Sequence, residues 1–243
     1  EFLNHLCANQ MDQPVGKVVY TQMCNQRGTI ECDMTIGRLA ADKFFIVVGT
    51  AFGLRASWWI KNHMPTDGSV SFQDVTSSYA VINVIGPKSR KLLQKLTNAD
   101  ISNANFPFGT CKQFTVGYAP ILSFRVTYVG ELGYELYIPT EFAVHVYESL
   151  WEAGQDLGIK NAGYRAISSM HLEKGYADWG SELTPEYTPF DAGLGFCVTL
   201  DKDDFIGKGA LAKVKTGGPR WELCSFNIDT GKTLMLQGRA PII

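Results

Sequence analysis

The strongest constraint on the fold is a series of strand patterns joined by tight turns near the start of the chain. Residues 16–50 contain three apolar segments, at about 16–24, 29–38 and 43–50. The sequence Asn-Gln-Arg-Gly separates the first two, and Gly28 can adopt the positive φ that a tight turn requires. Strands joined by so short a turn pair antiparallel, which predicts antiparallel strands in this region.

The rest of the chain mixes further strand patterns with helix patterns. Single strands are expected at 69–76 and 79–87, and residues 112–140 are expected to form a strand, a turn and then a hairpin. Two further strands are expected in the tail, at 195–200 and 220–228. Helices are expected at 2–8, 54–64, 88–96, 141–154, 163–175 and 207–215. Antiparallel runs with helices between them indicate an α+β fold, because a doubly wound sheet alternates strand and helix regularly. Neither G-x-G-x-x-G after a strand nor a P-loop occurs, so a nicotinamide or nucleoside triphosphate site is not indicated.

Composition and charge argue against several classes of protein. With 45% hydrophobic and 19% charged residues, the 243-residue chain is expected to fold around a core. A net charge of −2 gives no basic field for nucleic acid, and no apolar run reaches the roughly 18 residues of a membrane span. The six cysteines contain no C-x-x-C pair and the four histidines are scattered, so we expect free thiols in a reducing compartment and no metal site.

The two ends of the sequence indicate a piece of a longer protein. The chain begins with Glu1 rather than Met, and Phe2, Leu3 and Leu6 have the spacing of a helix that began upstream. The last residues are apolar and carry no terminating signal. We therefore expect the protein to continue on both sides.

Two glutamates lie within or beside a strand pattern at residues 127–140, which predicts a half-buried strand. A buried carboxylate needs hydrogen-bond donors, and two sources are open for Glu131 and Glu135. Arg125 could pair with Glu131 across the hairpin. Alternatively, a ligand with two parallel N–H groups, such as the 2-aminopyrimidinone edge of a pterin, could bind a carboxylate in a bidentate way, with Tyr128 and Tyr134 offering ring faces.

Asp33 is a second candidate site residue. It lies within an expected strand whose neighbours Ile30 and Met34 are apolar. Desolvation would raise the pKa of such an aspartate unless it is hydrogen-bonded, and a raised pKa suits proton transfer. The open alternative is an aspartate on an edge strand that faces water.

A third candidate is the acidic, aromatic-rich segment 161–196. Its glycines and prolines predict a helix followed by an ordered loop, and its aromatic residues include Tyr164, Tyr176, Trp179 and Tyr187. Long ordered loops often form the wall of a site, although a loop packed on its own aromatics is the alternative.

Three motifs, at residues 128–139, 161–196 and 204–211, resemble the aminomethyltransferase family of the glycine-cleavage T-protein, and the block 6–39 matches it too. The chain is most similar to the folate-binding C-terminal half of sarcosine and dimethylglycine dehydrogenases and of the regulatory subunit of pyruvate dehydrogenase phosphatase. The resemblance implies three subdomains arranged as a cloverleaf around a central folate site. We assign 1–65, completed by about 155–200, to the first, 66–154 to the second, and 201–243 to the start of a truncated C-terminal β subdomain.

The resemblance also implies roles for individual residues. It places the family's catalytic aspartate at Asp33 and its folate-binding residues at Glu131, Glu135, Tyr128, Arg125 and Tyr20. Arg125 and Arg165 are candidates for the anionic folate tail. His171 is a departure, because many relatives carry Arg at that position, and His is mostly neutral at pH 7.

The implied function is one-carbon transfer to tetrahydrofolate. In this interpretation an FAD-binding half of the same polypeptide oxidises an N-methyl amine to an iminium donor, and this part forms 5,10-methylenetetrahydrofolate. The location would be the mitochondrial matrix in a eukaryote and the cytoplasm in a bacterium, with no nucleic acid or membrane partner. A non-catalytic regulatory module and a glycine-cleavage aminomethyltransferase remain as alternatives.

Overall fold

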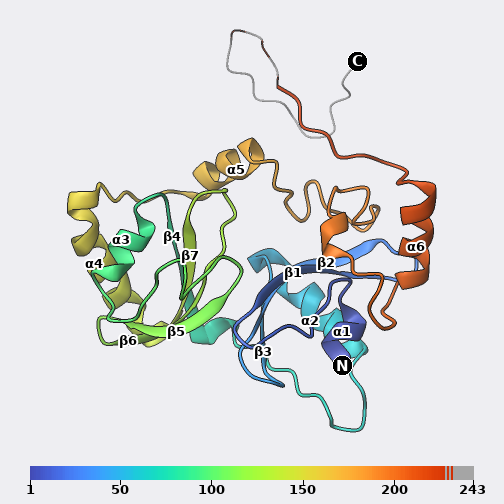
Figure 1. Ribbon diagram of the computed structural model, residues 1–243, viewed down its shortest axis with the longest axis horizontal. Helices are drawn as coiled ribbons and strands as arrows, with labels where there is room; N and C mark the ends of the chain where they lie inside the picture. The colour runs from blue at the N-terminus through green and yellow to red at the C-terminus, as the bar shows by residue number, and fades with distance from the viewer. Residues whose placement is uncertain (228, 230, 232–243) are drawn as a thin grey trace.

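Two antiparallel sheets form the centre of the computed structural model, which describes residues 1–227, 229 and 231 (Figure 1). The first sheet has the order β1-β2-β3 and is built from β1 (Val18–Cys24), β2 (Ile30–Arg38) and β3 (Phe44–Val47). The second has the order β4-β7-β6-β5, from β4 (Tyr79–Ile85), β5 (Cys111–Val116), β6 (Ala119–Phe124) and β7 (Gly133–Pro139). Since all pairings are antiparallel and helices lie between the strand runs, the α+β class is confirmed.

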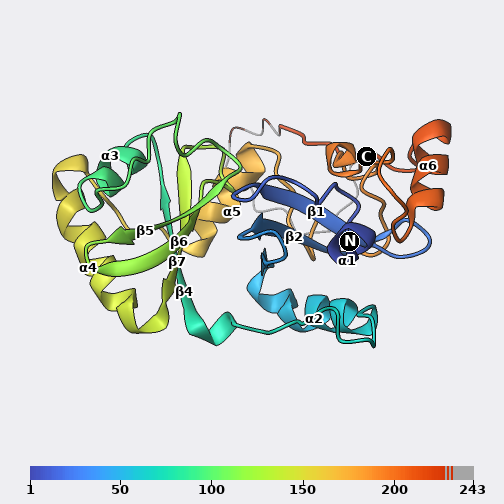
Figure 2. The same cartoon turned by 60° about the horizontal axis from the view of Figure 1, so that its bottom comes forward.

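Helices cover the outer face of each sheet. The α-helices are α1 (Phe2–Leu6), α2 (Gly53–Asn62), α3 (Ser89–Gln94), α4 (Ala143–Gly154), α5 (Tyr164–Glu173) and α6 (Lys208–Gly217); the 3-10 turns are η1 (Thr50–Phe52), η2 (Thr76–Ser78), η3 (Thr140–Phe142), η4 (Gln155–Leu157) and η5 (Gly195–Cys197). Helix α2 packs on the first sheet through Ala56 and Ile60, whereas α3 and α4 pack on the second. Figure 2 shows α3 and α4 on the far side of the second sheet from β1 and β2.

The inner faces of the two sheets meet in a mostly aromatic cluster, which positions the site described below. Phe124 of β6 and Tyr137 of β7 contact Phe45 of β3 edge-on, with ring centroids 6.0 and 5.1 Å from that of Phe45, and they contact each other at 4.9 Å. A Cβ added to Gly37 of β2 would lie 2.4 Å from the Phe124 ring. Gly37 therefore allows an approach of the two sheets that any larger residue would prevent.

Strand periodicity explains which side chains reach this inner layer. On β2, Cys32, Met34 and Ile36 are buried against α2, so the residues between them point toward the second sheet. On β7, Tyr134 packs toward α3 and α4, and Tyr137 packs toward the first sheet; both are nearly fully buried. The expected strand within 127–140 is therefore present at Gly133–Pro139, but it is covered on both faces because the first sheet packs against the face that carries Tyr137.

One expected strand, at 69–76, is replaced by local turns. The backbone N–H of Ser69 donates to Asp67 Oδ1, and that of Thr76 donates to Asp74 Oδ1, both at 2.9 Å. Short aspartate side chains that bond to the backbone two residues on compete with ladder hydrogen bonds. The pattern of apolar residues therefore predicted a strand at 69–76 that does not form.

The expected strands of the tail are also absent from its described residues. Residues 195–197 form the turn η5, in which the N–H of Cys197 donates to the carbonyl of Leu194. Residues 221–227 have no regular structure, and the N–H groups of Trp221 and Leu223 donate to Asp191 instead of a neighbouring strand. The remainder of the proposed C-terminal subdomain, 228 and most of 230–243, lies outside the described residues, and the division into subdomains stays a prediction.

Lys202, in the segment between η5 and α6, connects that segment to the start of the chain. Its side chain is only 6% exposed, and Nζ donates to the carbonyl oxygens of Asn4, Cys7 and Asn9 at 2.5, 2.5 and 2.7 Å. Burial lowers the pKa of Lys202 to about 8, while the surrounding oxygens favour the ammonium form. One side chain thus holds the end of α1 and the segment that follows it.

Replacing this anchor is expected to destabilise the protein. Lys202→Met leaves buried carbonyl oxygens without a donor, so the free energy of unfolding should fall by about 2–4 kcal/mol. Urea denaturation monitored by tryptophan fluorescence measures the change. The control is Lys213→Met on the exposed side of α6, which should stay within about 0.5 kcal/mol of the parent. Equal stability of both variants would show that the Lys202 contacts contribute nothing.

Candidate functional site

Asp33 occupies the inner face of the central strand β2. The hydroxyl of Tyr20, on the adjacent strand β1, donates to Asp33 Oδ2 at 2.9 Å. Burial raises the pKa of Asp33, the bond from Tyr20 opposes that shift, and the nearby charge of Asp178 adds to it. Because β2 has a strand on each side, the alternative of an edge-strand aspartate is wrong.

Tyr20 stays protonated in this environment. Burial raises its pKa well above the ordinary value of 10, and the charge and hydrogen bond of Asp33 raise it further. The pair therefore consists of a fixed O–H donor and a carboxyl group whose second oxygen, Oδ1, accepts no side-chain hydrogen bond from the described residues. Such a carboxyl group is poised to accept a proton from a ligand.

An aromatic stack lies beside this pair. The Tyr128 ring lies parallel to the His171 ring at 4.9 Å between centroids and to the Tyr176 ring at 6.2 Å. The Tyr128 hydroxyl donates to the carbonyl of Ala177 at 3.0 Å, and His171 Nδ1–H donates to the carbonyl of Tyr176 at 2.9 Å. Burial raises the pKa of Tyr128, and the charges of Asp178 and Asp33 contribute, which places the stack within electrostatic reach of Asp33.

Glu135 lies on the inner face of β7. Its Oε2 accepts a hydrogen bond from the Tyr137 hydroxyl, and burial raises the pKa of Glu135. The other oxygen, Oε1, receives no hydrogen bond from the described residues. Glu135 therefore keeps an acceptor available in the layer between the sheets.

Two predicted site residues do not join this group. Glu131 is exposed, before the start of β7, and Arg125 is 8% exposed with its Nη1 donating to the carbonyl of Phe106 at 2.8 Å. Neither takes part in an ion pair within the described part of the chain. The suggested pairing of Arg125 with Glu131 is therefore wrong, and their roles in binding folate remain predictions, as do those of Tyr20, Asp33, Tyr128 and Glu135.

Sequence reasoning singled out the segment 161–196 as a possible wall of the site, and the fold brings Asp178 of this segment near Asp33 and Tyr176 onto Tyr128. It missed Cys197, which lies just beyond that segment and near Asp33. The sequence did contain a signal for Gln22. It is a polar residue within a strand pattern, and its spacing of two positions from Tyr20 places both side chains on the same face of the strand.

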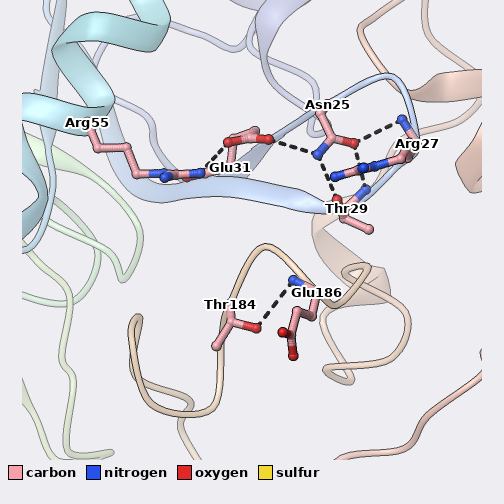
Figure 3. Close-up of polar contacts among 7 residues, drawn as sticks. All are labelled: Asn25, Arg27, Thr29, Glu31, Arg55, Thr184 and Glu186. Atoms are coloured by element: carbon pink, nitrogen blue, oxygen red, sulfur yellow. Dashed lines mark hydrogen bonds and ion pairs between the residues drawn. The ribbon is translucent and has the colours of Figure 1, made fainter.

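A cavity of about 800 Å³ lies elsewhere, among the β1–β2 hairpin, α1, α2 and the start of α6. Figure 3 shows that the hairpin's polar groups bond to one another: Asn25 Nδ2 donates to Thr29 Oγ1 and Glu31 Oε1 at 2.7 and 2.8 Å, and Glu31 pairs with Arg55. Since these groups satisfy each other, we regard the region as structural. Within residues 1–227, 229 and 231, no group of three His, Cys, Asp or Glu side chains could hold a metal ion, and no helix is long and apolar enough to span a bilayer.

Residues 1–202 match the family described as the GCVT N-terminal domain. The chain belongs to this family. The resemblance inferred from the motifs is thereby confirmed, and the GCVT-family chain is an aminomethyltransferase-like domain. A solved structure of glycine cleavage system aminomethyltransferase T from Bartonella henselae superposes with a TM-score of 0.75 at 22% identity, covering 90% of this chain and 58% of that one, which confirms the fold.

Two mouse proteins are similar over nearly the whole GCVT-family chain. It is 39% identical over 235 residues to the mitochondrial pyruvate dehydrogenase phosphatase regulatory subunit, covering 96% of this chain and 27% of that protein. It is 35% identical over 232 residues to the mitochondrial dimethylglycine dehydrogenase, covering 95% of this chain and 27% of that protein. The chain thus spans about a quarter of the length of these relatives.

Removing the half-buried charge at Asp33 is expected to stabilise the fold. The folded-state pKa of Asp33 lies above its ordinary value of 3.8, so its contribution to stability is complete below 3.8 and is lost as pH rises through the folded-state pKa. Asn at this position can still accept from Tyr20. Asp33→Asn should therefore raise the free energy of unfolding at pH 8 by about 0.5–2 kcal/mol, with a smaller gain at pH 4.

The control is an aspartate whose pKa is shifted in the opposite direction. Asp100 is exposed, and the hydrogen bonds of Ser102 and Asn105 lower its pKa to about 2, so it stabilises the fold above 3.8 and loses this contribution as pH falls. Urea denaturation at both pH values should show Asp100→Asn less stable than the parent at pH 8. A loss of stability at pH 8 in Asp33→Asn would show that the Asp33 carboxylate is not strained by burial.

Proposed function

We propose that this chain binds tetrahydrofolate at the Asp33 site and transfers a one-carbon unit to it, forming 5,10-methylenetetrahydrofolate, as part of a larger flavin-dependent N-methyl amine dehydrogenase. The observation that carries the proposal is the half-buried Asp33 carboxyl group, which accepts a hydrogen bond from the Tyr20 hydroxyl and lies beside the Tyr128 stack. The similarity to dimethylglycine dehydrogenase supports it.

The inner faces of the sheets offer groups that fit a pterin. The free Oε1 of Glu135 can accept from the paired N–H groups of a 2-aminopyrimidinone ring. The Tyr128 ring supplies an aromatic surface for a flat heterocycle. We propose that these two residues orient the folate ring with its reactive nitrogen toward Asp33.

Asp33 would manage the proton that this nitrogen releases. When folate N5 attacks the iminium carbon, a C–N bond forms, the C=N π pair moves onto the donor nitrogen, and N5 loses its proton, which Asp33 can accept at Oδ1. Asp33 then returns this proton to the donor nitrogen so that the amine leaves, and N10 attacks the same carbon and loses its proton to the released amine. The same carboxylate stabilises the cationic donor while it is bound. Tyr20 keeps Oδ2 occupied, so the proton-accepting oxygen has a defined direction.

FAD chemistry lies outside this chain in our proposal. The sequence holds no G-x-G-x-x-G, so the flavin would be bound by another part of the same polypeptide, which supplies the iminium donor. Both mouse relatives are mitochondrial by name, and we place the protein in the mitochondrial matrix if it is eukaryotic and in the cytoplasm if it is bacterial.

A regulatory module is the second candidate function. The identity to the pyruvate dehydrogenase phosphatase regulatory subunit, 39%, exceeds the 35% to mouse dimethylglycine dehydrogenase. Folds of one family can serve catalysis or regulation. Calorimetry of the full-length protein with tetrahydrofolate tests ligand binding, and turnover of an N-methyl amine separates an enzyme from a folate-binding regulator.

Glu135 should contribute more to folate binding than Glu131. The half-buried Glu135 carboxylate can form a charge-assisted bond worth about 1.5–3 kcal/mol, so Glu135→Gln should raise the Kd for tetrahydrofolate about 10- to 150-fold. Glu131→Gln is the matched control and should change Kd by less than about threefold, because Glu131 is exposed. Fluorescence quenching measures both. An unchanged Kd for Glu135→Gln would remove this residue from the site.

Asp33→Asn should separate binding from chemistry. We expect the Kd for tetrahydrofolate to change only a few fold, while methylenetetrahydrofolate formation slows by about 10²–10⁴-fold and formaldehyde is released instead. Product analysis of the full-length enzyme with its amine substrate measures both products. Formation at the parental rate would make Asp33 a structural residue and would contradict the proposed mechanism.

A further inference from the structure

Gln22 is a buried polar residue whose side-chain amide lacks hydrogen-bond partners among the described residues. Its side chain is 0% exposed, and within the described part of the chain neither amide atom forms a hydrogen bond of normal geometry. Burying an amide without hydrogen bonds is costly. The position therefore needs an explanation beyond packing.

The surroundings of Gln22 connect it to the candidate site. Gln22 on β1 lies directly opposite Asp33 on β2 in the antiparallel register, and it shares the inner face of β1 with Tyr20. Its amide lies next to the Tyr20 hydroxyl and the Cys197 thiol. A carboxamide has two N–H donors, one for each of these neighbours, and a rotation about its broad terminal torsion would complete either bond.

We infer that Gln22 is a positioning residue, which donates from Nε2 to the Tyr20 hydroxyl oxygen and so directs the hydroxyl proton toward Asp33 Oδ2. The inference deepens the proposed function and rests on it for its role in catalysis. Gln22 touches neither folate nor the one-carbon unit in this arrangement. It acts through Tyr20.

The chemical consequence follows from the direction of the two hydrogen bonds. A hydroxyl that accepts one hydrogen bond becomes a stronger donor in the next, so the Gln22 amide strengthens the bond from Tyr20 to Asp33. Donation to a carboxylate favours its ionised form. Gln22 therefore keeps more of Asp33 ionised and ready to accept a proton than burial alone would allow.

The other groups around Asp33 do not replace this effect. Tyr128 and Cys197 are neutral at physiological pH because burial raises the pKa of each, and Asp178 carries a like charge that opposes ionisation of Asp33. Tyr20 is the only side chain in the described residues that donates directly to Asp33. The strength of the hydrogen bond from Tyr20 to Asp33 therefore determines how readily Asp33 ionises.

Carbon-13 NMR of the 243-residue chain, labelled at its aspartate carboxyl groups, tests the inference. Asp33→Asn identifies the Asp33 signal, and its titration is followed in the parent and in Gln22→Met. We expect the Asp33 titration midpoint in Gln22→Met to rise by about one pH unit, the shift that corresponds to one hydrogen bond. An unchanged midpoint would overturn the inference.

The matched control is Ser123→Ala. Ser123 is also 0% exposed with an unpartnered side-chain oxygen, but its cross-strand partner Leu136 faces α3 and α4 rather than the inner layer. Its removal should leave the Asp33 midpoint in place, and an equal rise in this control would also overturn the inference, because general loosening would then explain the shift.

A smaller change covers the case in which Gln22→Met does not fold. Gln22→Asn keeps the amide but withdraws it from Tyr20 by one methylene, so the same upward shift is expected, and its absence contradicts the inference. The titration needs no folate, whereas the rate of Asp33→Asn tests the proposed function. If the Asp33 titration midpoint does not shift in the Gln22 variants and the Asp33→Asn enzyme is slow, only the role of Gln22 is rejected. If the midpoint shifts and the Asp33→Asn enzyme is fully active, only the proposed chemistry is rejected.

Discussion

The close contact between the two sheets is the constraint on which the rest of the structure depends. Phe124 lies over Gly37, and Phe45 and Tyr137 complete an edge-to-face cluster between the layers. This contact covers the inner face of β2 at one end and leaves Asp33 further along the same face. Without it, the carboxyl groups of Asp33 and Glu135 would meet water and keep their ordinary pKa values.

The same burial that favours proton transfer works against stability. Asp33 and Glu135 both have raised pKa values because desolvation disfavours their charged forms, and each keeps one tyrosine hydroxyl as compensation. A fold selected only for stability would place neutral residues there. These two incompletely compensated carboxyl groups on the inner surfaces are the reason why we propose a ligand between the sheets.

Local sequence patterns predicted most strands, the α+β class and the position of Asp33 within a strand, because periodicity and turn residues act over short distances. They failed at 69–76 and 195–200, where side-chain and backbone bonds within a few residues replaced the sheet ladder. They also failed for Arg125, which is near Glu131 in sequence but is held by the carbonyl of Phe106. The contribution of Asp178, Tyr176 and Cys197 arises from contacts over more than 40 residues, which no local pattern encodes.

The Lys202 anchor has a consequence for the order in which the chain folds during its synthesis. Its three backbone acceptors precede it by 193–198 residues, so α1 cannot be fastened until almost the whole described chain has left the ribosome. At translation rates of about 5–20 residues per second, that delay is about 10–40 s. The second sheet, made from contiguous residues 79–139, is complete well before then. The nascent chain would therefore fold from its middle outward, with its first helix among the last parts to dock.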